Sequence, residues 1–148
     1  MTAPFIMLVD DEVPFVETMA KRLATRNIET ITAFSAEEGL EKLTKNKNLE
    51  VIVLDVKMPG MDGLAALKEI KEAYPLIEVI MLTGNATIES AIDAMKLGAY
   101  DFLMKPFDIE ELVGKVEAAA RKKQEHEKKI QDALKQETLS KYGPFRYV

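Results

Sequence analysis

The centre of the chain contains the apolar run VIVL at residues 51–54, which Asp55 follows directly. An uninterrupted run of aliphatic and β-branched residues is typical of a β-strand that is covered on both faces. Pro59 and Gly60 then favour a turn, and residues 64–70 repeat apolar side chains at the spacing of a helix. This strand, turn and helix predict an α/β fold with a parallel sheet.

Similar units flank the central one on both sides. Apolar runs predict strands at residues 5–9, 28–33, 77–82 and 100–104, and helical periodicity follows them at 12–25, 36–43, 88–95 and 109–120. Strict alternation predicts helices on both faces of a parallel sheet, and right-handed crossovers leave few topologies. We expect a doubly wound, flavodoxin-like (βα)5 fold with strand order 2-1-3-4-5 and an extended C-terminal helix.

Local signals predict where three of the helices begin or end. Ser35 and Glu38 have the spacing of a capping box, and Asp108 is placed to cap the last helix. Residues 88–95 carry apolar side chains at i, i+3, i+4 and i+7, which predicts one apolar helix face. Gly98 is placed to end that helix.

The composition excludes several classes of protein. The chain has 148 residues, which is long enough for one ordinary domain and short for two. It has no cysteine, and its apolar runs are far shorter than the roughly 20 residues of a membrane helix. The N-terminus has no secretory pattern. We therefore expect a cytoplasmic protein with no membrane contact, in which His126, the only histidine, is solvated.

The charge is divided unevenly along the chain. Residues 1–120 carry 12 Lys and Arg against 21 Asp and Glu, whereas residues 121–148 carry 8 against 4. An acidic body does not favour direct binding of nucleic acid, because phosphates need clustered cations. We expect a domain over residues 1–122 and a charged helical extension over 123–148 with no output domain. A heptad through the extension would place Lys123 and His126 in its seam, which disfavours an autonomous coiled coil.

Polar side chains follow four of the predicted strands. Asp10 and Asp11 end the first run, Asp55 the third, Thr83 the fourth and Lys105 the fifth. The carboxyl ends of parallel strands meet at one edge of the sheet, where open α/β folds place their ligands. Clustered carboxylates favour Mg²⁺, and an ammonium and a hydroxyl beside them suit phosphoryl oxygens. Together these groups predict Mg²⁺-dependent phosphoryl transfer onto an aspartate.

Motifs at these strand ends resemble the receiver domain of two-component response regulators, the CheY-like superfamily. The motifs are VDDE at residues 9–12, LDVKMPGMDG at 54–63, LTG at 82–84 and GAYDFLMKPF at 98–107. They occur in the family's order, and the resemblance covers about residues 4–122. The last motif, with TIESA at 87–91, is most similar to receivers of the nitrogen-regulation type.

The resemblance implies a phosphoacceptor and a metal site. Asp55 would accept a phosphoryl group from a sensor histidine kinase or a phosphotransfer protein. Asp11, Asp55 and the backbone carbonyl of Lys57 would bind Mg²⁺, and Asp10 would act through a bound water. The chain would have no substrate beyond its own aspartate and would therefore not be an enzyme in the ordinary sense.

The resemblance also implies a switch. Thr83 and Lys105 would each contact a phosphoryl oxygen, and Phe102 would turn inward as Thr83 moves. The bond between Lys105 and Pro106 would be cis, which X-Pro bonds allow at modest cost. The side chains of Lys57 and Asn85 would flank the path of the hydrolytic water and modulate hydrolysis. The fourth helix, fifth strand and fifth helix would carry the signal to an unknown downstream protein and could form a homodimer.

Other interpretations stay open from the sequence. Asp10 and Asp11 could cap the following helix, and Phe102 could be an ordinary core residue. The chain could be a receiver fragment of a larger transcriptional regulator or a hybrid kinase. It could instead be a magnesium phosphohydrolase of the haloacid dehalogenase type, although that family expects a second aspartate where this chain has Lys57. An inactive fold that only docks partners is a further alternative.

Overall fold

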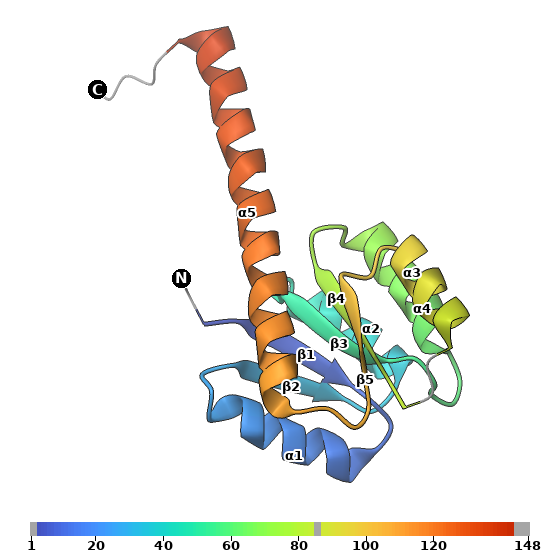
Figure 1. The fold of residues 1–148 in the computed structure, drawn as a ribbon. Helices are drawn as coiled ribbons and strands as arrows, with labels where there is room; N and C mark the ends of the chain where they lie inside the picture. Colours follow the sequence, from blue (N-terminus) through green and yellow to red (C-terminus); the bar gives the residue numbers. More distant parts are fainter. Residues whose placement is uncertain (1–2, 85–86, 144–148) are drawn as a thin grey trace.

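The computed structural model describes residues 3–84 and 87–143 (Figure 1). Strands and helices alternate along the chain, as the sequence predicts. The elements are β1 (Phe5–Val9), α1 (Val13–Ala24), β2 (Glu29–Ala33), α2 (Ala36–Lys45), β3 (Val51–Asp55), α3 (Gly63–Ala73), β4 (Glu78–Thr83), α4 (Ile88–Lys96), β5 (Asp101–Met104) and α5 (Ile109–Tyr142).

The five strands form one sheet in the order β2-β1-β3-β4-β5, and all neighbours are parallel. This confirms the predicted doubly wound topology. The central strand β3 pairs with β1 on one side, where Val9 lies beside Leu54, and with β4 on the other, where Asp55 lies beside Leu82. The carboxyl ends of β1, β3 and β4 therefore lie together at one edge.

Helices cover both faces of the sheet (Figure 1). Helices α1 and α5 cover one face, and α2, α3 and α4 cover the other. Alternate residues of each central strand enter opposite cores: Leu8 and Val53 face α1 and α5, whereas Met7 and Ile52 face the other helices. Every residue of β3 is buried for this reason. The continuous apolar run at residues 51–54 is thus explained by coverage on both faces.

The helix ends agree only in part with the sequence signals. Ser35 accepts a hydrogen bond from the backbone N–H of Glu38, but the Glu38 carboxylate accepts the N–H of Phe34 and not that of Ser35. Asp108 occupies the N-cap position of α5 as predicted, although its side chain forms no capping hydrogen bond. At the start of the helix, its negative charge still interacts favourably with the helix dipole.

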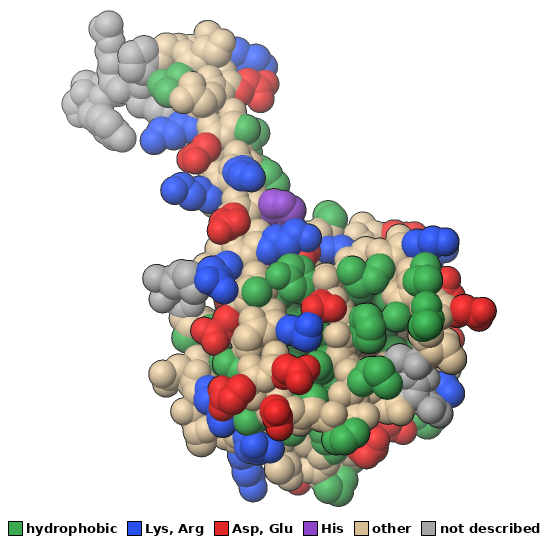
Figure 2. Space-filling model, viewed as in Figure 1, with side chains coloured by type: hydrophobic (Ala, Val, Ile, Leu, Met, Phe, Trp, Pro, Cys, Tyr) green, Lys and Arg blue, Asp and Glu red, His purple; other side chains and the backbone are tan. Residues whose placement is uncertain are grey.

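Helix α4 presents most of its apolar face to solvent. The only buried residue of this helix is Ala94. Ile88 is 81% exposed, and Ile92 and Met95 are almost half exposed. Figure 2 shows hydrophobic side chains gathered over α4 and β5. The periodicity correctly predicted an apolar face, but β5 is the last strand of the sheet and leaves most of that face uncovered.

Helix α5 continues far beyond the sheet (Figure 1). It is held at the amino edge of the sheet by two contacts: Lys122 Nζ lies 3.0 Å from Glu78 Oε2, and Gln124 Nε2 donates to Glu50 Oε2 at 2.5 Å. From His126 onward most described side chains of α5 are exposed, as expected for His126 itself. Among the described residues, no helix combines the length and apolar character needed to cross a membrane.

Gly63→Ala is expected to destabilise the protein by about 1 to 3 kcal/mol or more, because overpacking forces the backbone to move. A Cβ atom at residue 63 would lie 2.1 Å from the carbonyl oxygen of Asp55 and 2.7 Å from Val56 Cα. The matched control is Gly114→Ala in α5, where a Cβ would meet nothing within 4 Å. That variant should gain about 0.5 to 1 kcal/mol. Urea unfolding measures both changes, and equal stabilities of the two variants would contradict the prediction.

Candidate functional site

The residues predicted from the sequence gather at the carboxyl edge of the sheet. Asp10 follows β1, Asp55 is the last residue of β3, Thr83 is the last of β4 and Lys105 follows β5. Asp10, Asp55 and Thr83 are buried, whereas Asp11 is exposed. The parallel strands thus bring together side chains that are up to 95 residues apart in the chain.

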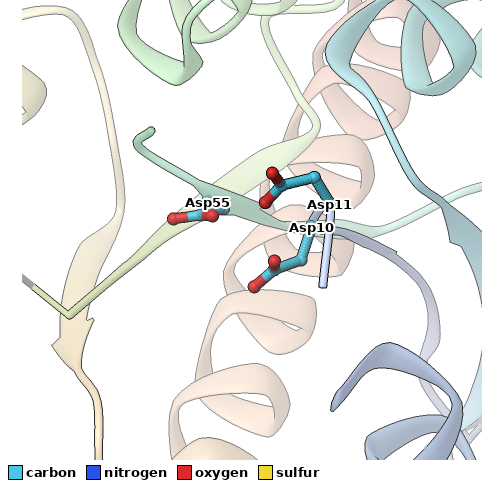
Figure 3. A group of neighbouring side chains, drawn as sticks. All are labelled: Asp10, Asp11 and Asp55. Atoms are coloured by element: carbon cyan, nitrogen blue, oxygen red, sulfur yellow. The ribbon is translucent and has the colours of Figure 1, made fainter. Parts of the chain in front are cut away.

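Three carboxylates approach one another at this edge (Figure 3). Asp10, Asp11 and Asp55 each offer an oxygen, and these atoms all lie within 4.8 Å of one another. Carboxylates at this separation repel unless a cation lies among them. One exposed and two buried acids leave the cluster open on the side of Asp11, which suits Mg²⁺ because this ion keeps several of its waters. The donor set therefore fits a magnesium ion.

Lys105 is held by the first acidic motif. Its Nζ lies 2.7 Å from Asp10 Oδ2 and 3.1 Å from Glu12 Oε1, and it lies 4.3 Å from the centre of the Phe15 ring. Burial alone would lower the pKa of the Lys105 ammonium, but its bonds to Asp10 and Glu12 and the nearby charges raise the pKa above its ordinary value. Glu12 belongs to the motif at residues 9–12, but neither Glu12 nor Phe15 was predicted from the sequence to contact Lys105. The available signal was their position shortly after the paired aspartates.

Both oxygens of Asp10 are engaged. Oδ2 accepts from Lys105, and Oδ1 accepts the backbone N–H of Glu12 at 2.9 Å. Helix α1 begins after Glu12 without any side-chain cap, so the alternative that the aspartates cap this helix does not describe the structure. Asp10 instead links the end of β1 to the lysine that follows β5.

The loop between β3 and α3 carries the remaining predicted ligand. The Lys57 backbone N–H donates to Asp55 Oδ1 at 3.4 Å, and the Lys57 side chain is exposed. Farther along, the Met61 N–H donates to Glu37 Oε1 of α2 at 2.8 Å, and this bond lowers the pKa of Glu37. Asp62 then caps α3 by accepting the N–H of Ala65. The role of Glu37 could not be predicted from the sequence, because its contact joins elements that are separate in the chain.

The predicted switch residues Thr83 and Phe102 lie close to each other. Thr83 is buried and Phe102 is half-buried, and both line one small cavity beside α4. The backbone N–H of Lys105 donates to the carbonyl of Thr83 at 2.8 Å, and the peptide bond between Lys105 and Pro106 is cis. Asn85, the second predicted modulator of hydrolysis, lies outside the described residues.

The environment of Asp55 disfavours its charged form. Burial and, to a lesser extent, the neighbouring Asp10 raise the pKa of this carboxyl from 3.8 to about 6, and this value already includes the opposing effect of Lys105. At neutral pH the carboxyl is therefore mostly ionised but close to its titration range. A bound cation would favour the ionised form.

Asp55→Asn is expected to stabilise the protein at pH 8 without magnesium, because it removes a buried charge. The folded state binds the Asp55 proton more tightly than the unfolded chain, so stability falls as the pH rises from about 4 through the folded pKa of about 6. At 1.36 kcal/mol per pKa unit, the advantage of the variant should approach about 3 kcal/mol at pH 8 and vanish below pH ~4.

Urea unfolding in a chelating buffer at both pH values measures this difference. Asp93→Asn on the exposed side of α4 is the control for loss of a carboxylate elsewhere. An advantage of Asp55→Asn that is equal at the two pH values would contradict the prediction.

The chain is similar in sequence to receiver domains of known response regulators. Residues 6–117 match the response regulator receiver domain family. The chain is 38% identical over 127 residues to the DNA-binding transcriptional regulator NtrC of Escherichia coli K12, covering 86% of this chain and 27% of NtrC. It is 37% identical over 110 residues to a putative NtrX-like response regulator of Rickettsia conorii, covering 73% of this chain and 23% of that protein. The chain thus spans about a quarter of these relatives.

Solved structures agree with the sequence match. The receiver domain of NtrX from Brucella abortus is 38% identical, with a TM-score of 0.73 over 78% of this chain and 98% of that one. A receiver domain protein from Clostridium thermocellum is 36% identical, with a TM-score of 0.78 over 82% and 97% of the two chains. This protein belongs to the response regulator receiver domain family, and its relatives are of the NtrC and NtrX type.

Proposed function

We propose that this chain is a phosphorylation-controlled switch whose phosphoacceptor is Asp55. A sensor histidine kinase or a phosphotransfer protein would donate the phosphoryl group. The observation that carries the proposal is the buried Asp55 carboxylate within an acidic cluster, next to the end of β1 where Asp10 holds Lys105. Proteins of the receiver family are phosphorylated in this way, and the resemblance extends to each of these residues.

The metal would be held by Asp11, Asp55 and the backbone carbonyl of Lys57. Asp10 would contact it through a water, which agrees with the engagement of both Asp10 oxygens by Lys105 and Glu12. Bound Mg²⁺ would neutralise part of the negative charge that accumulates around the transferred phosphoryl group. The acidic cluster supports a divalent cation, since its carboxylate oxygens lie within 4.8 Å of one another.

The transfer step itself needs little from the protein beyond position and charge. An Asp55 carboxylate oxygen attacks phosphorus, the bond between phosphorus and the donor imidazole nitrogen breaks, and the imidazole keeps the electron pair. The product is an acyl phosphate on Asp55. Lys105 and Thr83 would contact two of its oxygens, one with an ammonium and one with a hydroxyl. No other substrate is needed, so the chain would catalyse only its own phosphorylation and dephosphorylation.

The conformational response would pass through Thr83 to Phe102. These residues line one small cavity beside α4, so a shift of Thr83 toward the phosphoryl group would make room for the aromatic ring. Helix α4 lies directly over this cavity through Ser90, Ala91 and Ala94. Side chains of Lys57 and Asn85 would set the lifetime of the phosphoryl group.

The output would use the surface of α4, β5 and α5. Its apolar part is a groove of about 580 Å³ lined by Ile88, Ile92, Met95, Phe102 and Met104, among others. A downstream protein or a second receiver would bind there after phosphorylation. An exposed apolar groove of this size beside the switch residues supports an interaction surface.

Residues 1–122 would form the switch domain, and 123–148 a helical extension from it. The relatives named as DNA-binding regulators are about four times longer than the part matched here. We propose that this chain acts as the receiver part of such a regulatory system and that residues 1–148 control a partner by protein contact, without binding nucleic acid directly. A phosphohydrolase of the haloacid dehalogenase type is less well supported, since Lys57 stands where the second aspartate would be.

Acetyl phosphate with Mg²⁺ is expected to add one phosphoryl group to the protein, because Asp55 is the acid that the site activates. Intact-mass analysis measures the addition. Asp55→Asn should abolish it, and omission of Mg²⁺ should reduce it strongly. Asp93→Asn, at an exposed position on α4, should be labelled like the original protein. Persistent labelling of Asp55→Asn would show that the assignment is wrong.

Beryllofluoride with Mg²⁺ is expected to promote dimerisation if a second receiver is the partner. Ile92→Glu places a charge in the apolar groove and should prevent this dimer, while leaving phosphorylation of Asp55 unchanged. Sedimentation velocity measures the mass, and Leu134→Glu, at an exposed position of the α5 extension, is the control. An unchanged mass of the original protein would count against a homodimer through this surface.

A further inference from the structure

The ammonium of Lys105 is already occupied before any phosphoryl group is present. It has three N–H donors, and its ion pairs among the described residues are with Asp10 and Glu12, not with Asp55. The ring of Phe15 covers another side of the ammonium at 4.3 Å from its centre. Lys105 is only 17% exposed, so these neighbours leave it little access to water. The lysine must therefore exchange protein contacts when it binds a new anion.

Glu12 differs from the other contacts of Lys105. Asp10 is completely buried at the end of β1, whereas the Glu12 side chain is 63% exposed. Glu12 stands at the start of α1, but its side chain does not cap that helix. Its backbone N–H binds Asp10, and this bond would survive a change of the side chain. Within the described part of the chain, the polar partner of the Glu12 carboxylate is thus Lys105.

We propose that Glu12 is a positioning residue that holds Lys105 toward the end of β1 in the unphosphorylated protein. The Glu12–Lys105 ion pair competes with the contact between Lys105 and an anion on Asp55. Binding of that anion at Asp55 breaks or weakens the ion pair. The Glu12 carboxylate therefore contributes to the free energy that is needed to move Lys105 to the anion. This proposal rests on the proposed function, because it assumes that Lys105 binds an anionic group on Asp55.

Competition between Glu12 and the anion for Lys105 predicts how a change of Glu12 alters the affinity for the anion. Glu12→Gln keeps the length of the side chain but removes its charge, so the lysine becomes easier to displace. Because Glu12 is largely exposed, solvent weakens its ion pair with Lys105, and loss of the pair should tighten binding of beryllofluoride at saturating Mg²⁺ by about two- to fivefold. Glu17→Gln removes the same charge from an exposed position of α1 and should leave the affinity unchanged.

A double-mutant cycle separates positioning from simple charge. If Glu12 acts through Lys105, Glu12→Gln has no effect on affinity in the Lys105→Met background. If Glu12 merely repels the anion, the same tightening persists in that background. The affinity is measured from the ¹⁹F NMR signal of bound beryllofluoride in the full chain, and thermal unfolding checks that each variant is folded.

The outcomes separate this proposal from the proposed function. Tighter binding in Glu12→Gln, absent in Glu17→Gln and lost in the Lys105→Met background, supports the positioning role. Equal or weaker binding in Glu12→Gln overturns it, as does tightening that persists without Lys105. If the original protein gives no bound signal, or Asp55→Asn gives the same signal, the assignment of Asp55 fails and the positioning role fails with it.

Discussion

The parallel pairing of β3 between β1 and β4 is the constraint on which the rest of the structure depends. The register places Val9 beside Leu54 and Asp55 beside Leu82, so the last residues of these strands lie at one edge. A shift of one residue would turn every side chain of β3 to the opposite face. The apolar cores on both faces oppose such a shift. Because they hold β3 in register, they also fix the position of Asp55 at its end.

The same constraint creates an electrostatic cost at the edge. Burial and the neighbouring Asp10 raise the pKa of Asp55 to about 6, and Lys105 compensates only in part because its ion pairs are with Asp10 and Glu12. The three carboxylates at this edge therefore form a donor set that fits a divalent cation. The charges at this edge are thus only partly compensated by one another, as is common at functional sites.

Helix α4 and the C-terminal extension of α5 contribute least to the two cores, whereas the first part of α5 is well buried. Helix α4 buries only Ala94 and exposes an apolar face beside β5, while α5 leaves the sheet after its contacts to Glu78 and Glu50. Helix α4 lies next to the proposed switch residues, and the extension of α5 leads away from the domain. A switch needs such elements, since tightly packed strands have no alternative arrangement to adopt.

The sequence alone determined the order of elements, the sheet topology and the set of residues at its edge, because hydrophobic periodicity and strand-end positions are local properties that parallel pairing converts into one site. Only the tertiary structure decided the partners: Glu12 and Phe15 at Lys105, Glu37 at the β3–α3 loop, and the exposure of the α4 face. Periodicity predicts that a helix has an apolar face, but not what covers it. Contacts between distant elements depend on how those elements pack, which no local pattern records.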